Sequence, residues 1–240
     1  MLSQSNPMVV VARWYEDMIK RKTLLAVGAL LALPFALAPW VARPVTAAPA
    51  AIVAPIFATH HATAVLAGGC FWGLEDVFAK LRGVDDVTVG YSGGTRETAN
   101  YETVSSGRTG HAESVLIAYD PTKISYARLL DVYFSVAHDP TEIDRQGPDD
   151  GPQYRSEIFY ANAAQKRDAQ MAINALTTRK TFSRPIATRI APFAAFYVAE
   201  AYHQHFAEKN PTYPYIVAID APKIAVLEAR FPALVRSGSK

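Results

Sequence analysis

The sequence contains a single cysteine, Cys70, among its 240 residues. A chain with one cysteine cannot form an internal disulfide. The sequence also lacks a phosphate-binding loop and a dinucleotide-binding fingerprint. If the chain catalyses a reduction, the electrons must therefore come from thiols and not from a bound nicotinamide. Internal repeats and long linkers are absent too, which favours one compact domain with accessory ends.

An excess of charge of one sign is also missing. The formal net charge is +2, and charged residues make up 19% of the chain, too few for a disordered protein. Five basic and two acidic residues precede Ala48, which leaves 19 basic and 20 acidic residues in the rest. Binding to nucleic acid or to an anionic membrane surface needs a concentrated basic face. The near-neutral body therefore argues against both kinds of partner.

The first 48 residues have the pattern of an export signal. Three basic residues at 20–22 precede an apolar run at 23–41, and small residues follow at 46–50. This order is typical of a cleaved signal peptide, so we expect an exported, periplasmic protein. A run of about 18 apolar residues also suffices to span a bilayer, so an inner-membrane anchor through residues 23–41 is the alternative. Pro34 and Pro39 favour the signal peptide, and Met18 is a second candidate start of translation.

The remaining sequence predicts an α+β domain at residues 64–235, preceded by an Ala/Pro-rich tether at 49–63 and followed by a tail at 236–240. Apolar runs and alternating patterns predict strands at 64–67, 84–91, 113–119, 156–160 and 186–190.

Helical spacing of apolar residues predicts helices at 71–83, 126–137, from 163 onward, 198–209 and 222–231. Ser125 and Asn162 are the expected N-caps of the second and third helices. Up to residue 160 the order is βαββαβ, the plan of a ferredoxin-like two-layer sandwich, with a C-terminal helical extension.

Cys70 lies where a predicted strand ends and a predicted helix begins, after two glycines that permit a tight turn. Free backbone N–H groups and the positive end of a helix dipole stabilise a thiolate there, so we expect a lowered thiol pKa. Phe71 and Trp72 follow directly and are candidates for the wall of a small apolar pocket. A buried, inert cysteine beside core aromatic residues is the plainer alternative.

The segment GGCFWG at 68–73 strongly resembles the signature of the methionine sulfoxide reductase A family. Further matches follow in the order of the family's motifs: GYSGG at 90–94, NYETV at 100–104, GHAE at 110–113, HDP at 138–140, QYRS at 153–156, AYHQ at 201–204 and KNP at 209–211. Such an ordered series is far more specific than an isolated Gly-Cys-Phe.

The resemblance implies a reaction and a set of catalytic residues. In this family a thiolate attacks the sulfur of methionine sulfoxide, methionine leaves, and a sulfenic acid remains on the enzyme. The matching positions assign the thiolate to Cys70 and the acid that protonates the sulfoxide oxygen to Glu113. They assign the hydroxyls that bind this oxygen to Tyr101 and Tyr154.

The resemblance also implies how the substrate is held. Phe71 and Trp72 would hold the S-methyl group, and the family acts on the S epimer of the sulfoxide. Asp149 matches a family aspartate that helps to order the site, whereas Asp150 stands where many members have histidine. Oxidised proteins, peptides and free methionine sulfoxide are the expected substrates, and their repair is the expected role.

The chain departs from a common family pattern after its Asn-Pro motif. Many members carry a second cysteine there, which attacks the sulfenic acid and forms a disulfide. Here Asn210 and Pro211 are followed by Thr-Tyr-Pro-Tyr. We therefore expect no bound cofactor, and regeneration of Cys70 by an external thiol of the thioredoxin, glutaredoxin or glutathione class.

Other classes of function are weighed against this one. A Cys–His hydrolase would pair Cys70 with His111 or His138. A binding module on the same fold would recognise oxidised methionine without turnover, but Glu113 and the two tyrosines disfavour it. His203 and His205 are two positions apart and do not share a helix face, so we expect no metal site there.

Overall fold

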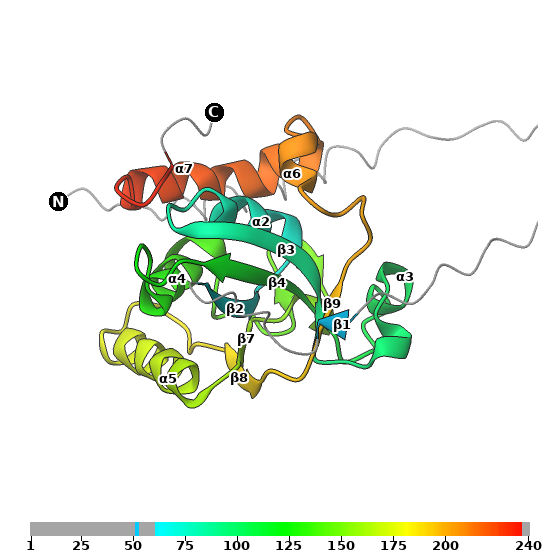
Figure 1. Cartoon of the computed structure of the whole chain (residues 1–240), viewed down its shortest axis with the longest axis horizontal. Coiled ribbons are helices and arrows are strands. Elements are labelled where there is room, and N and C mark those ends of the chain that lie inside the picture. Colours follow the sequence, from blue (N-terminus) through cyan, green and yellow to red (C-terminus); the bar gives the residue numbers. More distant parts are fainter. Residues whose placement is uncertain (1–50, 53–60, 237–240) are drawn as a thin grey trace, which may run out of the picture. The chain divides into compact units, whose positions relative to one another are not determined.

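The computed structural model describes residues 51–52 and 61–236. The predicted export segment at 1–48 and most of the predicted tether lie outside the described residues. The described part is an α+β structure with one large mixed sheet and helices packed against it (Figure 1). None of its helices is both long enough and apolar enough to cross a membrane.

The large sheet has seven strands in the order β1-β9-β3-β4-β2-β7-β8. All neighbouring strands are antiparallel except β7 and β8, which are parallel. A separate two-stranded sheet pairs β5 with β6. The strands are β1 (Ala51–Ile52), β2 (Ala62–Ala67), β3 (Val84–Ser92), β4 (Ala112–Tyr119), β5 (Arg145–Gln146), β6 (Asp149–Asp150), β7 (Glu157–Tyr160), β8 (Arg189–Pro192) and β9 (Phe196–Val198).

The helices cover the sheet and carry much of the surface. α7 lies over α2, and α2 lies over β3 and β4 (Figure 1). The α-helices are α2 (Phe71–Ala79), α3 (Tyr101–Val104), α4 (Tyr126–Val132), α5 (Ala163–Thr178), α6 (Phe206–Lys209) and α7 (Ala221–Arg230). The shorter or wider turns are η1 (Arg96–Thr98), η2 (Tyr133–Ala137), η3 (Pro152–Tyr154) and η4 (Ile216–Asp220).

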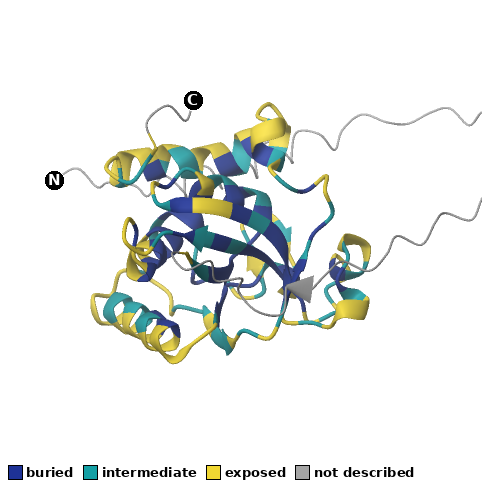
Figure 2. Cartoon of the chain, viewed as in Figure 1, coloured by how far each residue is buried: buried dark blue, intermediate teal, exposed yellow. Residues whose placement is uncertain are grey.

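Alternation of apolar and polar residues along the strands places one set of side chains in the core. Val87, Val89 and Tyr91 of β3 share one buried cluster with Val115 and Ile117 of β4. These side chains point to the same face because successive residues of a strand point to opposite faces. The central strands and most of α2 are buried, whereas α5 and α7 each expose one side (Figure 2).

Both predicted helix N-caps are confirmed. The Ser125 side chain accepts a hydrogen bond from the Arg128 backbone N–H at 3.2 Å, and the Asn162 side chain accepts one from the Gln165 N–H at 2.9 Å. Each bond satisfies a donor that the first turn of a helix leaves free.

The predicted helix at 198–209 is wrong. Its first residue belongs to β9, only Phe206–Lys209 is helical, and His205 has a φ of 56°. The Gln204 side chain bonds the N–H and the carbonyl of Val89 in β3, both at 3.0 Å. These long-range bonds hold an irregular segment against the sheet, and tertiary contacts of this kind override local helix propensity.

Three smaller predictions also need correction. The helix after Cys70 ends at Ala79, and Gly83 lies in the turn before β3. The predicted strand at 186–190 lies further along the chain, at Arg189–Pro192, where it pairs with β7. The predicted tether contributes Ala51–Ile52, which pairs with β9, and the first residues of β2. Pairing with a neighbouring strand decides these boundaries, which local patterns leave open.

Candidate active site

Cys70 joins the centre of the sheet to the first helix. Gly68 and Gly69 separate it from the end of β2, and it is the N-cap residue of α2. Gly69 before it has a φ of 96°, and a Cβ atom there would lie 2.5 Å from Cγ of Gln146. The tight turn therefore requires glycine for its backbone conformation and for its space. Cys70 itself is buried, with 9% of its surface exposed.

The electrostatic surroundings of Cys70 overturn the expected low thiol pKa. Burial, and then the negative charges of Glu113, Asp220 and Asp149, raise the pKa of the Cys70 thiol well above its ordinary value. The backbone N–H of Trp72 is the group that acts in the opposite direction. The helix start is present as predicted, but desolvation and three nearby carboxyl groups outweigh its stabilising N–H.

Glu113 is a buried acid at the beginning of β4. Its side chain is 2% exposed, and its Oε2 accepts a hydrogen bond from the backbone N–H of Phe71 at 3.1 Å. Burial raises the pKa of Glu113 to about 8, the Phe71 N–H lowers it, and Asp149 raises it further. The carboxyl group therefore carries its proton at neutral pH, the form in which it can act as an acid.

Tyr101 and Tyr154 belong to the same group of side chains. Burial is the first cause that raises the pKa of each hydroxyl, and the charges of Glu113, Cys70 and Asp149 contribute to both. Tyr101 begins α3 and is 36% exposed, whereas Tyr154 lies in η3 and is half-buried. The structure thus brings together the predicted thiol, the acid and the two hydroxyl donors.

Hydrogen bonds to charged side chains hold the segments that carry these tyrosines. Arg155 bonds Glu157 at 2.6 Å and the carbonyl oxygens of Gly110 and His111 at 2.9 and 3.0 Å, which ties η3 to the loop before β4. Glu200 accepts hydrogen bonds from the Tyr91 hydroxyl and from the Tyr101 N–H, both at 2.9 Å. The positions of Tyr101 and Tyr154 are therefore set from other elements.

The two predicted pocket aromatics differ in their surroundings. Phe71 is 1% exposed, and its ring centroid lies 5.0 Å from that of His203. Trp72 is half-buried, and its ring stacks on Phe206 at 3.8 Å. The edges of Tyr213 and Tyr215 also contact this ring, with centroids 6.2 and 6.0 Å away, and its Nε1 donates to Nδ1 of His203 at 3.2 Å. Trp72 is therefore enclosed by residues from the C-terminal part of the chain.

Asp149 lies on β6 and accepts a hydrogen bond from the Tyr215 hydroxyl at 2.5 Å. Burial raises the pKa of Asp149, whereas the Tyr215 hydroxyl and the Lys223 ammonium lower it. Asp150 beside it is exposed. Asp149 thus lies close enough to Cys70 for its charge to raise the pKa of the thiol.

The sequence predicted no role for several side chains at this site, namely His203, Tyr215, Asp220 and Lys223. Asp220 is 1% exposed, and its Oδ1 accepts a hydrogen bond from Nζ of Lys223 at 3.0 Å. A Cβ atom at Gly73 would lie 2.1 Å from this oxygen, so the glycine makes room for the carboxylate. Gly73, a glycine inside a predicted helix, is the sequence feature that could have indicated a close neighbour at this position.

The two histidines proposed as partners of Cys70 are engaged elsewhere. His138 bonds the Tyr133 carbonyl at 3.0 Å and the Ser156 hydroxyl at 2.7 Å through its two ring nitrogens. His111 bonds the Thr95 carbonyl at 2.9 Å and the Gly94 N–H at 3.3 Å. With both nitrogens occupied, neither ring is free to act as a base toward Cys70, which argues against the hydrolase alternative.

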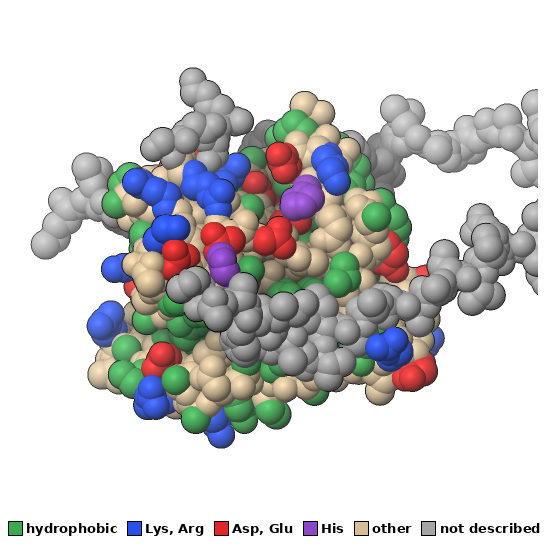
Figure 3. Space-filling model, in the orientation of Figure 1, with side chains coloured by type: hydrophobic (Ala, Val, Ile, Leu, Met, Phe, Trp, Pro, Cys, Tyr) green, Lys and Arg blue, Asp and Glu red, His purple; other side chains and the backbone are tan. Residues whose placement is uncertain are grey.

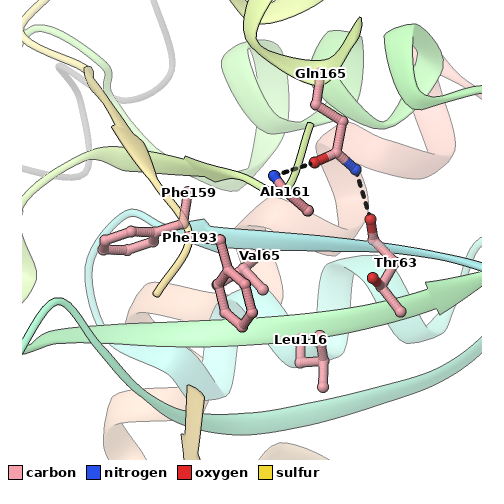
Figure 4. Close-up of a pocket in the computed structure, with 7 residues that line it drawn as sticks. All are labelled: Thr63, Val65, Leu116, Phe159, Ala161, Gln165 and Phe193. Atoms are coloured by element: carbon pink, nitrogen blue, oxygen red, sulfur yellow. Dashed lines mark hydrogen bonds between the residues drawn. The ribbon is translucent and has the colours of Figure 1, made fainter. Parts of the chain in front are cut away.

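Other parts of the described surface offer no comparable chemistry. A small hollow lined mainly by apolar side chains lies between β2, β4 and the start of α5, and it contains none of the side chains near Cys70 (Figure 4). Its lining residues are Thr63, Val65, Leu116, Phe159, Ala161, Gln165 and Phe193. Basic and acidic side chains lie side by side on the face in Figure 3. Within residues 61–236 no cluster of potential metal ligands is present.

Comparison with known proteins assigns this arrangement to a family. The family model for peptide methionine sulfoxide reductase matches residues 62–233. Peptide methionine sulfoxide reductase MsrA 2 of Mesorhizobium japonicum is 56% identical over 172 residues, which are 72% of this chain and 88% of that protein. MsrA 2 of Synechocystis sp. is 46% identical over 217 residues, which are 90% of this chain and 98% of that protein.

Solved structures agree with this assignment. Mxr1 from Saccharomyces cerevisiae in its reduced form aligns with a TM-score of 0.60 and 34% identity, covering 64% of this chain and 88% of that chain. Methionine sulfoxide reductase A of Corynebacterium diphtheriae aligns with a TM-score of 0.57 and 34% identity, covering 64% and 77%.

The fold and the site thus define an oxidoreductase that acts on sulfur. The chain belongs to the peptide methionine sulfoxide reductase family, type A, and its function is the reduction of methionine sulfoxide in the repair of oxidised proteins. The alternative of a binding module without turnover is therefore set aside.

Proposed function

We propose that Cys70 is the nucleophile that reduces the S epimer of methionine sulfoxide, in proteins and as the free amino acid. The Cys70 sulfur attacks the sulfoxide sulfur, the oxygen ends on Cys70 as a sulfenic acid, and methionine leaves. One thiol and one sulfoxide give one sulfenic acid and one thioether, so the step needs no further reductant. The observation that carries the proposal is that Glu113 is buried and protonated, and lies close enough to Cys70 for its charge to affect the pKa of the thiol.

The raised pKa of the Cys70 thiol decides how the proton moves. At neutral pH both Cys70 and Glu113 carry protons in the free protein. Glu113 protonates the sulfoxide oxygen, which is otherwise a poor leaving group, and the carboxylate that forms takes the proton of the thiol as the sulfur attacks. Tyr101 and Tyr154 donate hydrogen bonds to the same oxygen. Phe71 and Trp72 form the wall for the S-methyl group.

Regeneration of Cys70 requires a thiol from outside, because the chain has one cysteine. The first external thiol displaces the sulfenic hydroxyl as water and leaves a mixed disulfide. A second thiol then releases Cys70 and carries away the disulfide. Thioredoxin, glutaredoxin or glutathione supplies these thiols in our proposal, with no bound cofactor and no nucleic-acid partner.

A Cys70→Ser variant and a donor panel test this mechanism. We expect wild-type protein to form methionine from the S epimer with dithiothreitol and with at least one biological thiol donor, and the variant to form none. Mass spectrometry after substrate without donor should show one added oxygen on Cys70. Methionine formation by the serine variant, or activity on the R epimer alone, would refute the proposal.

We further infer that β3, β4, β2 and β7 with α2 and α4 form a ferredoxin-like core, to which the remaining strands and C-terminal helices are added. The order of these four strands and their antiparallel pairing support it. We also propose that residues 1–48 are a cleaved signal peptide and that the mature enzyme is periplasmic. An inner-membrane anchor through residues 23–41 is the alternative, and N-terminal sequencing of the fractionated protein distinguishes the two.

A further inference from the structure

Tyr215 connects two sides of the site that are far apart in the sequence. It precedes η4 directly and is half-buried. The edge of its ring meets the face of Trp72 on α2, with centroids 6.0 Å apart and an angle of 84° between the planes. Its hydroxyl donates to Oδ2 of Asp149 on β6 at 2.5 Å. One side chain thus contacts both the expected substrate wall and a carboxylate near the nucleophile.

Asp149 acts on every member of the proposed catalytic group. Its charge is among the causes that raise the pKa of Cys70, Glu113, Tyr101 and Tyr154. No other side chain among the described residues hydrogen-bonds the Asp149 carboxylate. Lys223 affects Asp149 through its positive charge and not through a hydrogen bond. The Tyr215 hydroxyl therefore holds the Asp149 carboxylate in position and, together with the Lys223 charge, favours its ionised form.

We propose that Tyr215 is a positioning residue for sulfoxide reduction: its hydroxyl fixes Asp149 near Cys70, and its ring fixes Trp72. The proposal rests on the proposed function of Cys70 and Glu113. The ionised Asp149 favours the protonated form of Glu113, which is the form that can donate to the sulfoxide oxygen. Loss of the hydroxyl weakens this control, whereas loss of the ring loosens the wall for the S-methyl group.

Two substitutions separate these contributions. Tyr215→Phe keeps the ring, so we expect kcat to fall about tenfold with KM changed by less than about threefold, because a hydrogen bond to a charged group is lost. Tyr215→Leu removes the ring as well, so we expect the same fall in kcat together with a rise in KM. Tyr213→Phe is the matched control: Tyr213 also meets Trp72 edge-on, but its hydroxyl has no hydrogen-bond partner among the described residues.

The pH dependence of kcat distinguishes this role from a general loosening of the fold, which would lower kcat without shifting its pH profile. In Tyr215→Phe the Asp149 carboxylate is no longer held in place by the hydroxyl, so its charge raises the pKa of Glu113 less, and the loss of activity on the basic side should move to lower pH. The titratable groups that also face Asp149 or Glu113 are Cys70, Tyr101, Tyr154, Asp220 and Lys223, and all are unchanged in this variant.

A double-mutant cycle with Asp149→Ala completes the test. If the Tyr215 hydroxyl acts through Asp149, the double variant has about the same kcat as Asp149→Ala alone. Additive losses, a kcat in Tyr215→Phe within twofold of the control, or an unmoved basic limb would overturn the proposal. All values are ratios to wild type with dithiothreitol, so loss of activity in Cys70→Ser tests the underlying function separately.

Discussion

The buried carboxyl group of Glu113 permits a test that combines activity with stability. Glutamine at position 113 has nearly the same shape, and its amide oxygen can still accept the 3.1 Å hydrogen bond from the Phe71 N–H. It cannot donate a proton to an oxygen that leaves a sulfur atom. General acids contribute about 10²- to 10⁴-fold to rate, so we expect kcat of Glu113→Gln to fall by about a hundredfold or more.

The pH profile of the wild-type protein should follow the protonation of Glu113. With a pKa of about 8, the carboxyl is about nine-tenths protonated at pH 7 and about one-tenth at pH 9. Single-turnover methionine formation should therefore decline with a midpoint near pH 8. The Cys70 thiol ionises only at higher pH and opposes this decline. In Glu113→Gln this decline should disappear, and the rate should only rise with pH as the Cys70 thiol ionises.

The same substitution should stabilise the fold at neutral pH. The folded pKa of Glu113 is about 8 and the unfolded value is 4.5, so folding at pH 7 requires protonation of the carboxylate. At about 1.4 kcal/mol per pH unit this lowers the free energy of unfolding by about 3 kcal/mol at pH 7, an upper bound, and by almost nothing at pH 4.

Urea unfolding at several pH values measures this difference. The stability advantage of Glu113→Gln over wild type should grow from pH 4 to pH 8 and then level off. A variant that keeps more than a third of wild-type kcat would refute the role of Glu113 as the acid. An advantage that does not change with pH would refute its raised pKa.

Three further predictions follow from the local geometry. Gly69→Ala should destabilise the fold by more than about 1 kcal/mol and reduce activity, because the new Cβ meets Gln146 at 2.5 Å and the φ of 96° is strained for alanine. Thermal unfolding measures the loss of stability, and methionine release measures the loss of activity. Asn162→Ala should lose about 1 kcal/mol by removing an N-cap, with kcat unchanged, because none of the described site residues lies on α5. Phe206→Ala should raise KM more than it lowers kcat, because it removes the ring stacked at 3.8 Å on Trp72.

The raised pKa of the Cys70 thiol affects its reactivity in the free protein. A thiol held mostly in its protonated form reacts slowly with oxidants, since the thiolate is the nucleophile. In the proposed mechanism a bound sulfoxide takes the proton of Glu113, and the carboxylate that forms can accept the proton of the thiol. On this mechanism, activation of the nucleophile depends on the presence of substrate.

Much of the molecule follows from local sequence. Gly69 permits the turn between β2 and α2, because only glycine adopts a φ of 96° without strain. Alternation of apolar residues determines which faces of β3 and β4 are buried, and Ser125 and Asn162 determine where two helices begin. The ordered motifs also predict the residues that the proposed mechanism uses as thiol, acid and hydroxyl donors.

Tertiary structure decided what those motifs do not contain. The pKa of Cys70 depends on burial and on carboxyl groups from β4, β6 and η4, which no local pattern near residue 70 reveals. The segment at 199–205 has helical spacing, yet Gln204 bonds β3 instead. Tyr215 reaches both Trp72 and Asp149 only after the chain folds back over α2. Desolvation and long-range contacts are properties of the packed molecule, and for that reason sequence determined the parts of this site while the fold determined their charges and their neighbours.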